Sequence, residues 1–162
     1  SILVVIRPPG MLGNYHNSRS EGLLVEAINH FASAANTDLL IVSRSQKDKD
    51  FINTTVKSKG NVRFLEKPVD GIQLVYAADY VLSGGGTMNR EAALVGAKTY
   101  SIFTGKKPYL DEYLQSLGRL SFIETADDIK NIKVARDLDK NSYSFNKEVV
   151  KEVTDIILSK IK

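Results

Sequence analysis

Short apolar runs of strand character alternate with helix-patterned segments along nearly the whole chain. The strand-like runs occupy residues 2–6, 38–43, 61–66, 80–83 and 98–103, with a weaker run at 119–123. Alternation of this kind places a crossover helix between successive parallel strands. It predicts an α/β fold: a Rossmann-like, doubly wound parallel sheet in three layers, α/β/α.

The helical segments show apolar residues at helical spacing and glycines at two ends. They occupy residues 20–35, 48–60, 71–78, 87–96 and 109–118, then a capped turn at 125–132 and a long last helix at 144–161. Gly96 and Gly118 stand where a left-handed C-terminal cap is needed. Residues 135–144 resemble a linker, so we expect the last helix to pack outside the core or against a missing neighbour.

The composition indicates one soluble globular domain over residues 1–162. Hydrophobic residues make up 43% and charged residues 25% of the chain, which is ordinary for such domains. No apolar run is long enough to span a membrane, and no signal peptide is recognisable. The absence of cysteine excludes disulfides and fits a cytoplasmic location. The first strand begins at the first residue, so we expect the chain to be part of something longer.

The charge pattern argues against two classes of partner. The net charge is +3, but the basic residues are scattered, whereas a nucleic-acid-binding protein clusters them. The two histidines, His16 and His30, lie in unrelated contexts, so we expect no metal site.

The stretch "SGGGT" follows the fourth strand-like run and directly precedes a helix. The first N–H groups of a helix lack internal partners and carry partial positive charge, and glycines let an anion approach them. We therefore favour an anion site over a plain tight turn, with Thr87 as the N-cap. The loop is neither a Walker A motif nor the dinucleotide fingerprint. Its candidate residues are Ser83, Gly84, Gly85, Gly86 and Thr87.

Two charged residues follow on the same helix. Glu91 lies one turn after Thr87 on the same face, where a carboxylate accepts hydrogen bonds from vicinal hydroxyls, as on a ribose. A solvent-facing glutamate is the equally open alternative. Arg90 is placed with it among the candidate substrate-binding residues.

The loop after the first strand carries a second set of candidates. Arg7 ends the strand and can clamp a diphosphate bidentately, although a structural arginine is an equal alternative. The prolines after it hold Arg7 extended. His16, between Tyr15 and Asn17, is the weak candidate for a catalytic base.

The segment "ADYVLSGGGTMNREAALVGAKTYSIFTGKKPYLDEYLQSLG" resembles the carboxyl-terminal domain of GT-B glycosyltransferases. It looks most like the DUF354 family, which is similar to the non-hydrolysing UDP-N-acetylglucosamine 2-epimerases. The loop "VVIRPPGMLGNYHN" supports the likeness, which covers nearly the whole chain. The resemblance implies one half of a GT-B fold, with the amino-terminal domain absent from this chain.

The resemblance also implies roles for residues. The glycine loop and Arg7 would contact the diphosphate, Glu91 the ribose, and Pro68 and Val69 the uracil base. By the same resemblance, Lys106 and Lys107 would reach a phosphate and Asp111 a sugar hydroxyl; solvated loop charges and a helix start are the alternative. The epimerases have a His-Arg pair after the first strand, and this chain has Arg7-Pro8-Pro9 instead, which puts the epimerase reaction in doubt.

Two hypotheses of function follow. The first is a nucleotide-diphosphate-sugar-binding domain of a glycosyltransferase- or epimerase-like enzyme acting on a UDP-N-acetylhexosamine, with no cofactor or metal. The second is a non-catalytic α/β domain that binds a phosphorylated ligand or a protein partner. The sequence does not specify the sugar, the acceptor, the stereochemical course or the oligomeric state.

Overall fold

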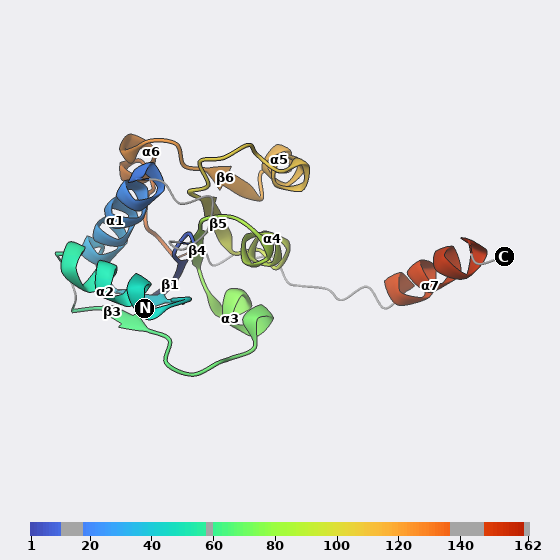
Figure 1. Ribbon diagram of the computed structural model, residues 1–162, viewed down its shortest axis with the longest axis horizontal. Coiled ribbons are helices and arrows are strands. Elements are labelled where there is room, and N and C mark those ends of the chain that lie inside the picture. Colours follow the sequence, from blue (N-terminus) through green and yellow to red (C-terminus); the bar gives the residue numbers. More distant parts are fainter. Residues whose placement is uncertain (11–17, 58–59, 137–147, 161–162) are drawn as a thin grey trace.

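The computed structural model describes residues 1–10, 18–57, 60–136 and 148–160. It contains one sheet of six parallel strands with helices on both faces (Figure 1). The elements in chain order are β1 (Ile2–Arg7), α1 (Ser18–Ser33), β2 (Thr37–Ile41), α2 (Gln46–Thr55), β3 (Val62–Phe64), α3 (Gly71–Ala77), β4 (Tyr80–Ser83), α4 (Thr87–Leu94), β5 (Lys98–Ser101), α5 (Tyr109–Ser116), β6 (Leu120–Phe122), α6 (Ala126–Lys130) and α7 (Glu148–Lys160).

The strands lie in the order β3-β2-β1-β4-β5-β6, and every neighbouring pair is parallel. The chain moves outward from β1 to β3, then returns to the other side of β1 and moves outward again to β6. The strand order therefore reverses between β1 and β4, which is the switch point where doubly wound sheets bind ligands. The predicted fold class is confirmed.

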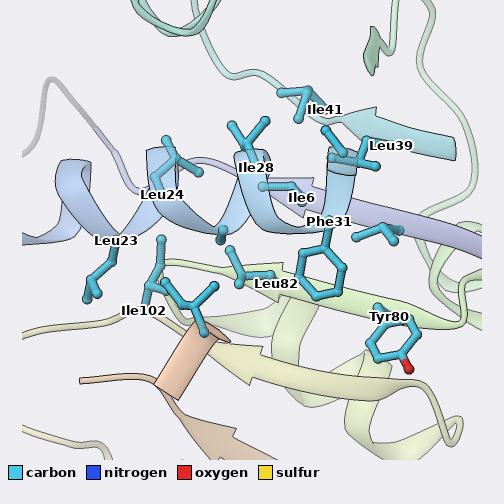
Figure 2. Close-up of a cluster of buried hydrophobic side chains, with 14 of the residues drawn as sticks. Ile6, Leu23, Leu24, Ile28, Phe31, Leu39, Ile41, Tyr80, Leu82 and Ile102 are labelled. Atoms are coloured by element: carbon cyan, nitrogen blue, oxygen red, sulfur yellow. The ribbon is translucent and has the colours of Figure 1, made fainter. Parts of the chain in front are cut away.

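Each face of the sheet has its own hydrophobic core. Along β1, Val4 and Ile6 point into the larger cluster, whereas Val5 points into the smaller one, as the two-residue repeat of a strand requires. In the larger cluster, Phe31 and Ile28 of α1 lie over the strands (Figure 2). Burial on both faces explains why the strands are continuous apolar runs.

Capping side chains set helix ends that the apolar pattern did not locate. Helix α2 begins at Gln46 and ends at Thr55, not at 48 and 60 as predicted. The Ser45 side chain accepts from the Asp48 N–H, and the Asp48 side chain accepts from the Ser45 N–H, a capping box. Because Asp48 is the third helical residue rather than the first, the helix starts earlier.

Helix α7 differs from the others in that none of its residues is buried. Its apolar residues, including Val150, Ile156 and Leu158, are all exposed, so the helix lies outside the core; whether it packs against a neighbour stays a prediction. Among the described helices, none is long and apolar enough to cross a membrane.

Removal of the Phe31 ring should destabilise the fold strongly. Phe31 is fully buried and lies 5.4 Å from the Tyr80 ring, centroid to centroid. Phe31→Ala should lower the free energy of unfolding by about 3–5 kcal/mol, measured by urea denaturation. Leu94→Ala, at an exposed helix position, should change it by less than about 0.5 kcal/mol. Equal effects of the two substitutions would contradict the core described here.

The cap of α6 should make the stability of the fold depend on pH in the acid range. The Asp128 carboxylate accepts from the N–H groups of Glu124 and Thr125, and these bonds lower its pKa below the usual value. The stabilisation is therefore present above the pKa of an unfolded aspartate and is lost as the pH falls through the lower folded value. Asp128→Ala should flatten the fall in melting temperature below about pH 4. An unchanged acid profile would contradict this assignment.

Candidate functional site

Two of the predicted site residues lie side by side at the switch point. Arg7 ends β1, Ser83 ends β4, and the two are register partners in the parallel pair. The loop after β1 and the glycine loop after β4 therefore leave the sheet at the same place. The topology thus brings together residues that are far apart in the sequence.

The buried side chain of Ser83 holds the glycine loop in place through hydrogen bonds. The residue is fully buried, its hydroxyl donates to Asn89 Oδ1 at 2.8 Å, and it accepts from the Gly85 N–H at 3.2 Å. Both interactions direct the Ser83 hydroxyl into the loop in this structure, and its contact with a phosphate stays a prediction. Asn89, which the sequence analysis missed, is the buried partner that fixes the hydroxyl.

The three glycines serve different purposes. A Cβ on Gly84 would lie 2.7 Å from both Cα and Cβ of Pro9, so a side chain there would force the two loops apart. Gly85 and Gly86 have φ angles of 91° and 96°, which L-residues rarely adopt. A Cβ on Gly86 would have no atom within 4 Å, so the loop is open to solvent at that point.

The N-terminus of α4 faces this open point, but Thr87 does not cap it. The N-cap is Gly86, and no side chain makes a capping hydrogen bond. The prediction of Thr87 as N-cap is wrong because Thr87 is already the first helical residue. Within the described part of the chain, no capping side chain accepts a hydrogen bond at this helix end, as an anion-binding helix end requires.

Arg90 is held by a buried carboxylate. Its Nε donates to Asp111 Oδ1 at 2.6 Å, and the Asp111 side chain is fully buried at the start of α5. Asp111 is therefore not a solvated charge, and its position in the first turn of α5 agrees with the alternative that it marks a helix start. The Arg90 side chain stays 30% exposed, so it is the half of the pair that a ligand can reach.

Arg7 has an unsatisfied group. Its Nε is buried and has no hydrogen-bond partner among the residues that the structure describes. Leaving such a donor unpaired costs about 1–3 kcal/mol, and more for a charged group. Since the strand position and the following prolines fix the residue, this donor is the strongest sign in the site that an anion belongs there.

The remaining predicted residues have different positions. Glu91 is partly exposed on α4, while Pro68 and Val69 are exposed in the loop after β3. Lys106 is exposed, and Lys107 forms an ion pair with Glu124 at 2.7 Å. His16, with Tyr15 and Asn17, lies outside the described residues. Across the described residues, no three acidic, histidine or cysteine side chains gather as a metal site requires.

Phe103 is a second contact that the sequence analysis missed. It follows β5, and its Cβ would lie 3.4 Å from a Cβ on Gly85, whereas its Cζ would lie 2.6 Å from one on Gly105. The ring therefore fits between two glycines and supports the glycine loop from the side of β5.

The sheet order, the parallel strands and the loops at the switch point define a Rossmann-like α/β domain of the kind that forms one half of GT-B proteins. The family model described as "Protein of unknown function (DUF354)" matches residues 2–162. The chain belongs to this family.

Relatives of known sequence or structure agree with the fold. An uncharacterized protein of Methanocaldococcus jannaschii, MJ0665, is 28% identical over 130 residues, covering 80% of this chain and 35% of that protein. The UDP-GlcNAc 2-epimerase of the same organism, in complex with UDP-GlcNAc and UDP, superposes with a TM-score of 0.67 at 12% identity, over 98% of this chain and 46% of that one. The glycosyltransferase VinC, in complex with dTDP, superposes with a TM-score of 0.55 at 16% identity. The match covers 81% of this chain and 32% of VinC. The chain therefore spans less than half of each of these relatives.

The contact between Gly84 and Pro9 should make Gly84→Ala destabilising. The new methyl group has to displace backbone at 2.7 Å, and overpacking of this kind costs about 1–3 kcal/mol. The same substitution at Gly22 in α1, where a Cβ meets nothing within 4 Å, should be stabilising by about 0.5–1 kcal/mol. Urea denaturation measures both, and a stabilising Gly84→Ala would refute the close approach.

Proposed function

We propose that this chain is the nucleotide-diphosphate-sugar-binding domain of a glycosyltransferase- or epimerase-like enzyme, and that its ligand is a UDP-linked N-acetylhexosamine. The observation that carries the proposal is the buried, unpartnered Nε of Arg7 beside the glycine loop. A diphosphate supplies the acceptor oxygens that this donor lacks.

The arrangement of the candidates along the sheet edge supports a nucleotide in one orientation. Glu91 lies in α4, the uncapped N-terminus of α4 comes next, and Arg7 lies beyond it on β1. A ribose on Glu91 then has its phosphates at the helix N-terminus and at Arg7. Pro68 and Val69, exposed in the loop before α3, are the residues proposed to border the base.

The structural relatives support the ligand class. The M. jannaschii epimerase was solved with UDP-GlcNAc and UDP, and VinC with dTDP. Both superpose on this chain, with identities of 12% and 16%. The likeness shows the fold, and the charge around the glycine loop is what links that fold to a nucleotide diphosphate here.

Such a site promotes departure of the nucleotide from the sugar. As the bond between the sugar and the diphosphate breaks, negative charge develops on the leaving phosphate. Preorganised N–H groups at the start of α4 and the Arg7 guanidinium stabilise that charge. We expect these 162 residues to bind weakly and not to turn over, because a GT-B cleft needs an amino-terminal domain as well.

The role of Glu91 can be tested with the ribose. Glu91→Ala should weaken UDP binding about tenfold, the scale of a charge-assisted hydrogen bond, as measured by calorimetry. The same substitution should matter much less for 2′-deoxy-UDP, which lacks one of the two hydroxyls. Glu112→Ala removes an exposed glutamate from α5 and should leave both affinities unchanged.

Further arms of the same experiment separate the two hypotheses. Gly85→Val should abolish UDP binding, because Gly85 has a positive φ in the loop, and circular dichroism checks that the variant is folded. UDP and UDP-GlcNAc should bind more tightly than ATP. If ATP binds equally well and Glu91→Ala has no effect on any ligand, the nucleotide-sugar proposal is wrong and a domain for another phosphorylated ligand or partner remains.

A further inference from the structure

Arg7 has a neighbour of the same charge that the sequence analysis did not single out. Arg44 lies just beyond the carboxyl end of β2, which pairs with β1. Its backbone N–H donates to Asp48 Oδ2 at 2.8 Å, so the capping residue of α2 fixes the backbone position of Arg44. A Cβ on Gly10 would lie 3.3 Å from Arg44 Nη1. The guanidinium of Arg44 therefore reaches across to the segment that follows Arg7.

The two guanidinium groups affect each other electrostatically. Burial lowers the pKa of Arg44 below its usual value, the charge of Arg7 lowers it further, and Asp48 raises it in part. Among the described residues, no carboxylate forms an ion pair with Arg7 or Arg44. Asp48 uses its Oδ2 to accept the backbone N–H groups of Arg44 and Ser45. Two like charges held near each other are unfavourable unless an anion lies between them.

The site thus has a sequence of anion-binding groups along one edge of the sheet. From β4 to β2 these are the N-terminus of α4, then Arg7, then Arg44. In the binding mode proposed above, a ligand with a single phosphate places that phosphate at the helix N-terminus. A second phosphate further from the ribose extends toward the arginines.

We propose that Arg7 and Arg44 together bind the distal phosphate of the diphosphate, the one that carries the sugar. The inference rests on the proposed function and deepens it: the site selects nucleoside diphosphates over monophosphates. Each planar guanidinium offers paired N–H donors to phosphate oxygens, and the phosphate neutralises two charges that otherwise repel.

The test compares ligands that differ in the distal phosphate. Calorimetry is performed with UDP, UMP and inorganic pyrophosphate on the unsubstituted chain and on Arg44→Gln. The variant should bind UDP and pyrophosphate at least about tenfold more weakly, the scale of a lost charge-assisted contact. Its affinity for UMP should change less than about twofold, because UMP has no distal phosphate. Equal losses for UDP and UMP, or no loss for UDP, would overturn the proposal.

A matched control and a measurement without ligand separate this role from others. Lys47→Gln removes the same charge from an exposed position in the first turn of α2 and should not discriminate UDP from UMP. In the absence of ligand, Arg44→Gln should raise the melting temperature, since it removes repulsion of Arg7. Arg44→Lys keeps the charge but not the paired donors and should recover only part of the UDP affinity. A lower melting temperature together with unselective loss of binding would show that Arg44 is merely structural.

The outcomes for this inference and for the proposed function are distinguishable. Binding of UDP that depends on Glu91 but not on Arg44 refutes the arginine pair alone. Binding of pyrophosphate that depends on Arg44, without any preference for uridine, refutes the nucleotide-sugar ligand. That outcome still supports the binding of phosphate by Arg7 and Arg44. If neither UDP nor pyrophosphate binds, both are refuted.

Discussion

The parallel pairing of β1 with β4 determines almost everything else in the site. Its register sets Arg7 opposite Ser83, and a slip of one residue would turn the side chains of a strand to the other face of the sheet. The side chains of β1 pack into both cores, Val5 on one face and Val4 and Ile6 on the other, and this packing holds the register. Packing of the two cores therefore positions the charged end of the strand.

The same register explains the glycine loop more fully than a bound anion does. Because β1 and β4 end together, Pro9 lies against Gly84, and the chain then turns through two residues with positive φ before α4 begins. The triplet is thus required by packing and backbone conformation within the chain. Arg7, rather than the number of glycines, is therefore the better sign of a ligand, because its buried Nε has no acceptor among the described residues.

The sequence predicts the fold well because strands that are buried on both faces of the sheet appear in the sequence as continuous apolar runs. Helix ends are less accurate, since a capping box such as Ser45 with Asp48 depends on a pairing three residues apart and not on periodicity. Arg7, Gly85 and Gly86 could be named as candidates from the sequence because Arg7 stands at a strand end and the glycines stand in a loop of unusual composition. Whether those residues bind a nucleotide stays a prediction.

The contacts that the sequence analysis missed share a physical reason: the two partners come from different elements. Asp111 meets Arg90 from the next helix, and nothing near it in the sequence distinguishes it from a solvated charge. Arg44 belongs to a polar stretch that reads as an ordinary exposed loop. Only the order of the strands, which places β2 beside β1, brings it near Arg7.

The open side of the site limits what the proposed domain does alone. Gly86 and Thr87 are exposed, so the described residues leave the start of α4 open to solvent. Transfer or rearrangement of a sugar requires that water be excluded from the reacting carbon. On the proposed function, the chain therefore supplies the charge that holds and releases the nucleotide, and the groups that act on the sugar have to come from a surface that faces this edge of the sheet.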